Sequence, residues 1–416
     1  MLAVLAFFCY FFLFVWLIQR VFKRKRIEIG GRLAIFIFSF KVLMGCLYGY
    51  VFLRYYGGDD TWMFYRDSLT EYQKLIHQPG GFIKDFFPGS SFGPGVEFWQ
   101  GWRHYLEDLE YWLMLKMLAI FNIFSLGNYY IDALFFDFVV FWGPVLLFKL
   151  LLSFFPGKKN ILIACLFFLP SVVFWISGIR AEGLLVLFIG LILYYTYQWY
   201  LKKGFWRFCW ILAGFSGFLI FRGQYLLAFL LPFFCWILTM RNPLKSFYGF
   251  VISYLSVFLI FLGSLLISPE KNLSSPLVSR QQEFLKLHGN TRFRLDSLKP
   301  SIPSFIKTAP QAFENAFLRP YLWEAKGPLQ ILSALETMGF WALVLLLITY
   351  PENDWKKILL HPLLMVFLFY GASQILLIGY IVPFPGAIVR YKSIPELFLV
   401  ISMALAIKWN KIYKLK

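Results

Sequence analysis

Charged residues are scarce in this sequence of 416 residues: they make up 15% of it, whereas hydrophobic residues make up 60% and aromatic residues 22%. A soluble domain of this length does not bury so large an apolar fraction, so a soluble globular protein is excluded. Mean hydropathy is +0.66, and the apolar residues form blocks long enough to cross a bilayer. The composition therefore predicts a polytopic membrane protein.

Cysteine and histidine are also rare. The five cysteines all lie inside apolar blocks, so the sequence predicts neither a disulfide framework nor a thiolate metal site. The four histidines show no metal-ligand spacing. The phosphate-binding pattern G-x-x-x-x-G-K and the zinc motif H-E-x-x-H are missing from the sequence. Function therefore has to be sought in less familiar patterns.

Acidic residues number 22 against 40 Lys and Arg, which gives a formal net charge of +18. Such a balance is typical of nucleic-acid binding in a soluble protein, but in a membrane protein Lys and Arg collect in cytoplasmic loops. We predict about eleven spans from the apolar blocks. They cover roughly 2–19, 33–53, 131–153, 161–177, 183–200, 208–221, 224–240, 247–267, 330–349, 362–380 and 396–408.

The basic segments between these spans alternate regularly. With the N-terminus outside, they all fall on one side of the membrane, which we assign to the cytoplasm. The excess of Lys and Arg is then explained without nucleic acid as a partner. These segments are Arg20–Arg32, Pro156–Asn160, Leu201–Arg207, Arg241–Lys245, Pro351–His361 and the tail from Lys408.

We therefore predict an all-α fold, a polytopic transmembrane helical bundle that forms a single integral membrane domain over 1–416. Two larger extracytoplasmic loops, 54–130 with an acidic motif and 268–329, are expected to contain amphipathic helices. The segment 111–127 is short and carries Lys116. We interpret it as an interfacial or re-entrant helix rather than a twelfth span.

An acidic pair stands out in the first of these loops, in the stretch RYYGGDD. Asp59 and Asp60 follow Gly57 and Gly58 directly after an apolar block, and the glycines let the backbone turn sharply there. Adjacent carboxylates can bind a divalent cation, or one of them can act as a general base. Alternatively, Asp60 is the N-cap of an amphipathic helix over Thr61–Leu75. The local sequence leaves both interpretations open.

Several charged residues are predicted at the same face of the membrane. Arg180 and Glu182 lie in a very short outer turn, Arg222 opens another, and Arg390 and Lys392 precede the last span. An ionisable residue at the end of a span is a functional candidate by default. Arginine binds phosphate through two hydrogen bonds and keeps its charge at any pH, so the group predicts an anionic ligand. The alternative for any single arginine is contact with lipid headgroups.

This layout resembles the GT-C superfamily of polytopic glycosyltransferases, which contains protein O-mannosyltransferases and lipid A aminoarabinose transferases. Family members carry an acidic pair in the first outer loop, here Asp59 and Asp60, and often an acidic residue in the next, here Glu182. The stretches FLPSVVFWISGIRAEGLL and VRYKSIPELFLVI are similar to segments of the family. The resemblance covers most of residues 33–408. The chain departs from it in the extra span 2–19 and in a glutamate where aspartate is common.

The resemblance implies a membrane glycosyltransferase that moves a sugar from a polyprenyl-phosphate donor to an unknown extracytoplasmic acceptor, a glycan, lipid or protein. It implies an integral protein of the bacterial cytoplasmic (inner) membrane, with its active site facing the extracytoplasmic side and membrane lipids around it. No cofactor is required, although Asp59, Asp60 and Glu182 allow a divalent cation. In this scheme the catalytic residues are Asp59, Asp60 and Glu182, and the lipid phosphate is bound by Arg180, Arg222, Arg390 and Lys392.

Three other functions remain open. A polysaccharide polymerase or ligase of the O-antigen type would depend on arginines of the late outer loop, Arg280, Arg292 and Arg294. A transporter of lipid-linked glycans would need ionisable groups within the membrane, for which the candidates are Lys41, Asp132, Asp137 and Lys149. A membrane O-acyltransferase is disfavoured because no catalytic histidine motif lies in or near a span.

Overall fold

The computed structural model describes residues 2–87, 89, 98–240, 243–266, 272–288 and 291–413. Within these ranges every regular element is helical, and β pairing is limited to one isolated bridge between Pro351 and Ile407. The prediction of an all-α protein is confirmed at this level. The chain divides into two compact units, Met1–Lys159 with Val173–Gln224, and Asn160–Val172 with Tyr225–Lys416. Each unit is described by itself below.

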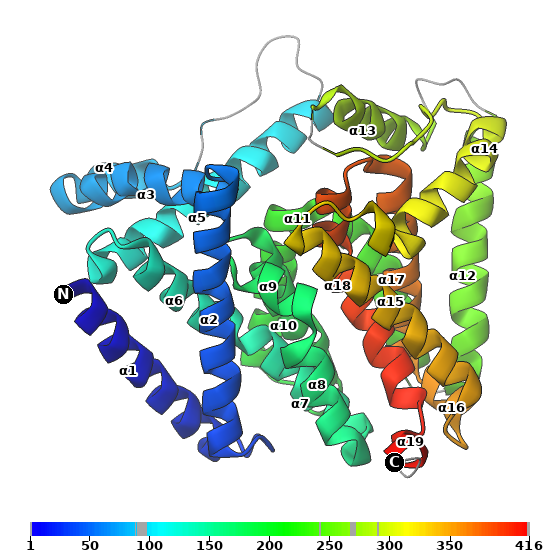
Figure 1. Ribbon diagram of the computed structural model, residues 1–416, viewed down its shortest axis with the longest axis horizontal. Coiled ribbons are helices and arrows are strands. Elements are labelled where there is room, and N and C mark those ends of the chain that lie inside the picture. The colour runs from blue at the N-terminus through cyan, green and yellow to red at the C-terminus, as the bar shows by residue number, and fades with distance from the viewer. Residues whose placement is uncertain are drawn as a thin grey trace. The chain divides into compact units, whose positions relative to one another are not determined.

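The first unit combines long apolar helices with a shorter polar layer. Figure 1 shows α3 and α4 running crosswise to α2. Within this unit α3 packs along α5, α10 along α7, and α6 against both α1 and α2. Its helices are α1 (Leu2–Arg24), α2 (Gly31–Tyr56), α3 (Asp60–His77), α4 (Pro79–Lys84), α5 (Phe98–Ser125), α6 (Tyr129–Val140), α7 (Trp142–Phe154), η1 (Pro156–Lys158) and α10 (Ala181–Leu201), together with the end of α9 (Pro170–Ser177) and the first part of α11 (Phe205–Thr239).

Aromatic stacking anchors the polar layer of this unit to its apolar helices. The indole of Trp62 on α3 stacks on the ring of Tyr129 on α6, with the ring centroids 4.0 Å apart. The indole nitrogen donates to the carbonyl oxygen of Gly49 on α2 at 2.9 Å. Burial of such large rings is a major source of stabilisation. The start of α3 is thereby fixed against α2 and α6.

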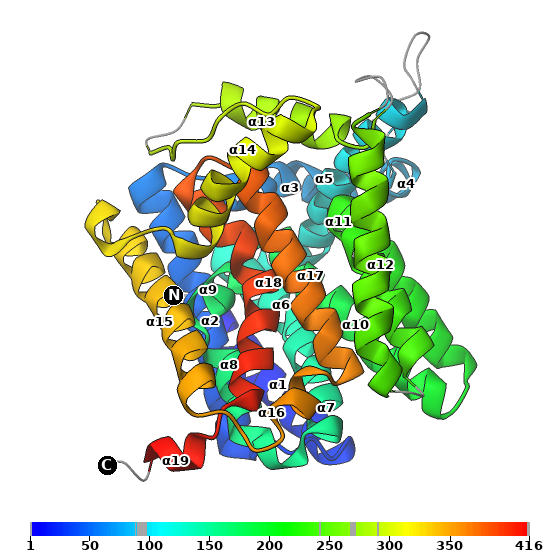
Figure 2. The same cartoon turned by 90° about the vertical axis from the view of Figure 1, so that its right-hand side faces the viewer.

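The second unit contains the later apolar helices. Figure 2 shows α12, α17, α18 and α15 side by side, and α17 packs against both α12 and α18. The helices of this unit are most of α8 (Lys159–Phe168), the remainder of α11, α12 (Pro243–Ser264), α13 (Ser275–Lys286), α14 (Ile302–Phe313), η2 (Glu314–Leu318), η3 (Leu322–Glu324), α15 (Pro328–Thr349), α16 (Trp355–Leu359), α17 (Pro362–Ile381), α18 (Pro385–Ala406) and α19 (Trp409–Tyr413).

Eight helical segments in the described part of the chain are long and apolar enough to cross a membrane, and a bent pair of helices raises the number to nine. The eight are Leu2–Arg24, Gly31–Tyr56, Tyr129–Phe154, Ala181–Leu201, Phe205–Thr239, Ser246–Ser264, Pro328–Thr349 and Pro362–Ile381, and the pair is Pro156–Phe168 with Pro170–Ser177. These helices make the chain an integral membrane protein. The finer count of about eleven spans stays a prediction.

The smaller number has two sources. The spans expected at 208–221 and 224–240 are counted as one segment, Phe205–Thr239, although α11 consists of two helices that meet at a kink with non-helical dihedral angles at Arg222 (φ −156°, ψ 60°). The span expected at 396–408 belongs to α18, which carries Arg390, Lys392 and Glu396. Such charges disfavour a purely lipid-exposed helix, and α18 is not among the eight segments.

The segment 111–127 belongs to a longer helix than expected. α5 runs from Phe98 to Ser125 and is absent from the candidate spans of the described chain. Lys116 lies on this helix and is 1% exposed. Its Nζ binds Oε2 of Glu71 on α3 at 2.6 Å, and its charge lies over the ring of Phe82. A lysine that looked incompatible with burial is therefore paired inside the first unit.

Candidate functional site

The acidic pair is presented by a sharp turn between α2 and α3. Helix α2 ends at Tyr56. Its C-cap, Gly57, adopts the left-handed region at φ 71°, and Gly58 follows at φ 114°. Side chains are strained at these angles, so glycine is the residue that fits there. Asp59 then returns to an extended conformation, with φ −152° and ψ −165°. The two glycines thus bring Asp59 and Asp60 to the end of an apolar helix.

The N-cap of α3 is Asp59 and not Asp60, which corrects our expectation. Asp60 already belongs to the helix, while the extended backbone of Asp59 lets its Oδ1 accept from the amide of Thr61 at 3.1 Å. An N-cap residue has this non-helical geometry and satisfies an otherwise unpaired amide of the first turn. The predicted helix over Thr61–Leu75 extends to His77.

Arg180 contacts three acidic residues of the first unit. It lies just before α10 and is 4% exposed. One guanidinium nitrogen, Nη1, donates to Oδ2 of Asp59 at 2.6 Å, and Nη2 donates to Oδ2 of Asp60. Nε lies 3.6 Å from Oε2 of Glu182. The planar guanidinium group therefore contacts three carboxylates at once, a geometry that the point charge of lysine does not provide.

A tyrosine from α2 completes this arrangement. The hydroxyl of Tyr48 donates to Oδ2 of Asp59 at 2.9 Å and accepts from Nη1 of Arg180, also at 2.9 Å. Tyr48 is fully buried. Sequence reasoning missed it, because a tyrosine inside an apolar block of a chain with 24 tyrosines gives no signal.

A second arginine extends the network. Nη1 of Arg222 donates to Oε1 of Glu110 on α5 at 2.5 Å, and its Nη2 lies 3.7 Å from Oε1 of Glu182. The same Nη1 donates to the carbonyl oxygen of Phe221 at 3.0 Å, where the backbone departs from helical geometry. The tight turn predicted at Arg222 is thus the kink at which the two helices of α11 meet. Glu110 was also missed, since nothing in its local sequence separates it from the other acidic residues of the loop.

The carboxylates of this network differ in their surroundings. Those of Asp59, Asp60, Glu110 and Glu182 contact the guanidinium groups of Arg180 and Arg222. Burial raises the pKa of Asp59, and Arg180, the Tyr48 hydroxyl and the Thr61 amide act in the opposite direction. The side chain of Asp59 is 14% exposed and that of Asp60 is 53% exposed. Asp60 is thus the carboxylate of the pair that solvent reaches.

The two remaining predicted site residues belong to the second unit. Arg390 lies over the ring of Tyr391, with its guanidinium carbon 4.8 Å from the ring centroid. Lys392 is 5% exposed, and its Nζ donates to Oγ1 of Thr337 at 3.2 Å and lies 3.7 Å from Oε2 of Glu396. The ammonium group of Lys392 is thus already paired inside its own unit. The structure brings together Asp59, Asp60, Arg180, Glu182 and Arg222, all of the first unit.

Sequence reasoning also missed two glutamates of the second unit. Glu396 is the partner of Lys392, and Oε1 of Glu336 accepts from the Ser171 hydroxyl at 2.9 Å and from the Ser171 amide at 3.2 Å. Each lies in an apolar helix, so hydropathy gave no reason to single it out. These groups form a polar cluster within the second unit.

Metal-ligating side chains were the second feature expected at the acidic pair. In the described ranges, no group of three or more His, Cys, Asp and Glu side chains is placed to hold a metal ion, and a divalent cation at Asp59, Asp60 and Glu182 stays a prediction.

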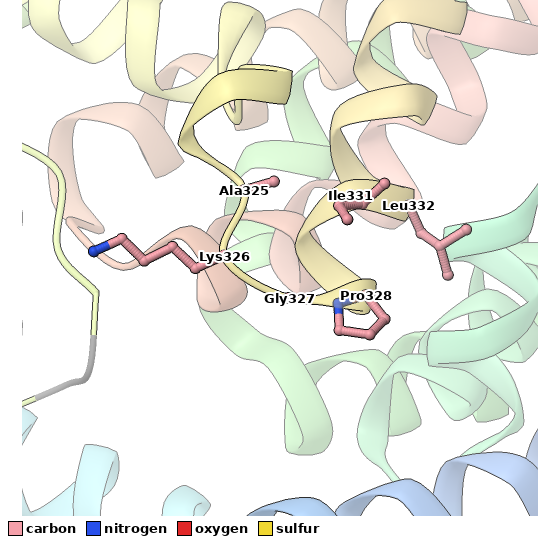
Figure 3. Close-up of a pocket in the computed structure, with 6 residues that line it drawn as sticks. All are labelled: Ala325, Lys326, Gly327, Pro328, Ile331 and Leu332. Atoms are coloured by element: carbon pink, nitrogen blue, oxygen red, sulfur yellow. The ribbon is translucent and has the colours of Figure 1, made fainter.

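In the second unit an open cavity of ≈ 600 Å³ lies at the start of α15 (Figure 3). Figure 3 shows Lys326 extending away from Ile331 and Leu332. The cavity is lined by Ala325, Lys326, Gly327, Pro328, Ile331 and Leu332.

Fold and site together define a helical integral membrane protein with a buried arginine–carboxylate network next to the end of an apolar helix. Comparison of the chain with models of known protein families, with curated proteins and with solved structures finds no match.

Proposed function

We propose that this protein is a membrane glycosyltransferase that moves a sugar from a polyprenyl-phosphate donor to an extracytoplasmic acceptor. One observation carries the proposal: a buried arginine binds two adjacent carboxylates immediately after an apolar helix, and the second of them is open to solvent. A pair so placed fits the activation of a hydroxyl group beside a lipid-anchored donor. The resemblance to GT-C glycosyltransferases supports the same assignment.

Asp60 is the general base in this proposal and Asp59 is its support. Asp59 accepts from Tyr48, Arg180 and the Thr61 amide, so its oxygens are already engaged. The side chain of Asp60 contacts Arg180 but is 53% exposed, which leaves room for an acceptor. A general base must reach the proton that it removes, so accessibility favours Asp60.

The reaction proposed is a single displacement with inversion. The acceptor hydroxyl transfers its proton to Asp60 while its oxygen forms a bond to the anomeric carbon. The bond between that carbon and the phosphate oxygen breaks, and its electron pair stays with the lipid phosphate. Fixed cations directed at the departing phosphate lower the barrier.

The cations expected to bind the lipid phosphate have contacts within the protein. Arg180 and Arg222 are each held by carboxylates, and Lys392 is paired with Glu396. Arg66 adds an exposed guanidinium group near the acidic turn, because a Cβ built on Gly58 would lie 3.8 Å from its Nη2. We propose that Arg66 binds the donor phosphate from solvent, together with Arg222 of the same unit.

The test is turnover of a panel of polyprenyl-phosphate sugars by purified protein in lipid nanodiscs with an acceptor extract. Asp60→Asn should lower kcat by roughly 10²–10⁴-fold, the range expected for loss of a general base. Asp354→Asn is the matched control, since that carboxylate is 68% exposed and pairs with Lys357 one turn away in the second unit. Equal donor turnover by Asp60→Asn and the parent would overturn the proposed base. Loss of turnover in Arg294→Ala, with Asp60→Asn active, would instead favour the polymerase or ligase.

A further inference from the structure

A buried ion pair joins two apolar helices of the first unit. Nζ of Lys41 on α2 lies 3.0 Å from Oδ1 of Asp137 on α6, and both side chains are less than a tenth exposed. Replacing such a pair by apolar residues is often neutral for stability, so stability alone does not explain it. Ionisable groups inside apolar spans are a sign of function.

The ammonium group of Lys41 has two further acceptors. It donates to the carbonyl oxygen of Ile176 at 3.0 Å and to Oγ of Ser177 at 3.1 Å. These residues end α9. A lysine can donate three hydrogen bonds. Here the Ile176 carbonyl oxygen and Ser177 Oγ accept two of them, and the Asp137 carboxylate forms the ion pair at 3.0 Å. Lys41 thus caps the free carbonyl end of α9.

The chain after Ser177 fits tightly against the same face of α2. A Cβ at Gly45 would lie 2.8 Å from the carbonyl oxygen of Ser177, and a Cβ at Gly178 would lie 2.8 Å from the ring of Tyr48. Lys41, Gly45 and Tyr48 are spaced by one turn each, so they share one side of the helix. Two residues after Gly178 comes Arg180, which shares the Tyr48 hydroxyl with Asp59.

We propose that Lys41 and Asp137 are positioning residues that hold the turn Ser177–Glu182 on α2, so that Arg180 reaches Asp59 and Asp60. Asp137 fixes the ammonium group, and the ammonium group fixes the end of α9. Without these bonds α9 frays at its C-terminus and the guanidinium group loses its register with the acidic pair. The effect on turnover rests on the proposed function, whereas the effect on the turn does not.

Displacement of a catalytic group by about 1 Å can cost roughly 10² in rate. Lys41 and Asp137 were candidates for a transport pathway on sequence grounds. The bonds to Ile176 and Ser177 give them a local task in the first unit instead.

The experiment compares variants in nanodiscs by hydrogen exchange of the peptide 173–180 and by thermal unfolding. Lys41→Met/Asp137→Leu removes both charges and leaves no buried ion unpaired. We expect its midpoint to stay near that of the parent while the peptide exchanges at least about tenfold faster, because local opening is detected separately from global unfolding. Lys41→Arg keeps donors for the same acceptors and should restore most of the protection.

The matched control is Lys116→Met/Glu71→Leu. This pair is equally buried, with side-chain exposures of 1% and 9%. Glu71 lies 11 residues after Asp60, about 16 Å further along α3 at 1.5 Å per residue. The control should leave exchange of the peptide 173–180 unchanged. If the Lys41/Asp137 double variant does not fold, Ser177→Ala serves instead, since it removes one acceptor of Lys41 without disturbing charge, and should accelerate exchange by about two- to fivefold.

The positioning role is overturned if Lys41→Met/Asp137→Leu folds and its peptide 173–180 exchanges hydrogen at the rate of the parent. If that variant does not fold, the same result in Ser177→Ala overturns it. Faster exchange together with donor turnover in the parent should come with a drop in kcat of about 10² in Lys41→Met/Asp137→Leu. Faster exchange with no donor turnover by the parent overturns the glycosyltransferase and leaves the positioning role standing. The experiment therefore distinguishes failure of the positioning role from failure of the proposed glycosyltransferase function.

Discussion

The guanidinium group of Arg180 donates to Oδ2 of Asp59 at 2.6 Å across 121 positions of sequence. This contact joins the end of α2 to the start of α10. Because the arginine is buried and its partner nearly so, neither charge is well solvated without the other. The contact makes the network a unit rather than a set of independent side chains.

Removal of this arginine should therefore cost more than loss of a surface ion pair. In Arg180→Met the Asp59 carboxylate is left without its cation, and we expect destabilisation of about 3 kcal/mol or more. Arg180→Lys should restore part of that stability but not the contacts to three carboxylates. Thermal unfolding in nanodiscs measures both. If Arg180→Met unfolds at the same midpoint as the parent, the Asp59 carboxyl group is solvated or protonated when the arginine is removed.

Much of this site could be predicted from sequence, for a physical reason. Asp59, Asp60, Arg180, Glu182 and Arg222 all stand at interruptions of apolar blocks, where charge is conspicuous. Topology then places such interruptions together at one face. The acidic pair became a candidate because other charged residues were predicted at the same membrane face. The local motif GGDD by itself allowed a helix cap as readily as a general base. In the structure Asp59 provides the cap and Asp60 stays exposed.

The parts that sequence reasoning missed are buried polar groups inside apolar helices. Tyr48, Glu336 and Glu396 depend on which side of a helix faces which neighbour, and hydropathy does not contain that information. The same limit applies to Lys116, whose partner Glu71 comes from another helix. The two helices of α11 meet at the kink at Arg222, where the sequence predicted a tight turn between two spans.

The raised pKa of Asp59 gives stability a specific pH dependence. The native carboxyl binds its proton more tightly than the unfolded one, whose pKa is near the ordinary 3.8. As pH rises from that value through the raised native pKa, the native state holds the extra proton, so the contribution of Asp59 to stability decreases. Below this window its contribution is fully present. Midpoints measured against pH should therefore decline less in Asp59→Asn than in the parent.

The exposed carboxylate Asp354 provides the control for this experiment. Asp354→Asn should follow the pH profile of the parent. A profile of Asp59→Asn that declines as steeply as that of the parent would mean that burial does not govern the carboxyl of Asp59.

Loss of the Tyr48 hydroxyl group should lower the stability of the protein. Tyr48→Phe removes a donor to Asp59 and an acceptor for Arg180 without changing the packing of the ring. Leaving buried polar partners unsatisfied costs about 1–3 kcal/mol. The unfolding midpoint should fall accordingly. Tyr50→Phe on the same helix is the control, since Tyr50 is 50% exposed and its substitution should be nearly neutral. Equal midpoints for the two variants would contradict the assigned role.

The coupling free energy between Glu110 and Arg222 should lie between those of exposed and of buried ion pairs. Their side chains are 22% and 21% exposed, with Nη1 and Oε1 2.5 Å apart. Exposed pairs contribute about 0.2–1 kcal/mol, and partial burial should raise the coupling to roughly 1–2 kcal/mol. A double-mutant cycle with Glu110→Gln and Arg222→Met measures it. Additive effects of the two substitutions would mean that the contact does not hold the break in α11.

Gly178 offers the most local test of how the turn is held. A methyl group at Gly178 would lie 2.8 Å from the ring of Tyr48, within a buried site. Overpacking of this kind costs about 1–3 kcal/mol, and the shifted turn should also weaken the contact of Arg180 with Asp59. Gly339→Ala is the matched substitution, because a Cβ at Gly339 in α15 meets no atom within 4 Å. Since alanine is the better helix former by about 1 kcal/mol, Gly339→Ala should be neutral or stabilising. The same response to both substitutions would show that the turn tolerates displacement from α2.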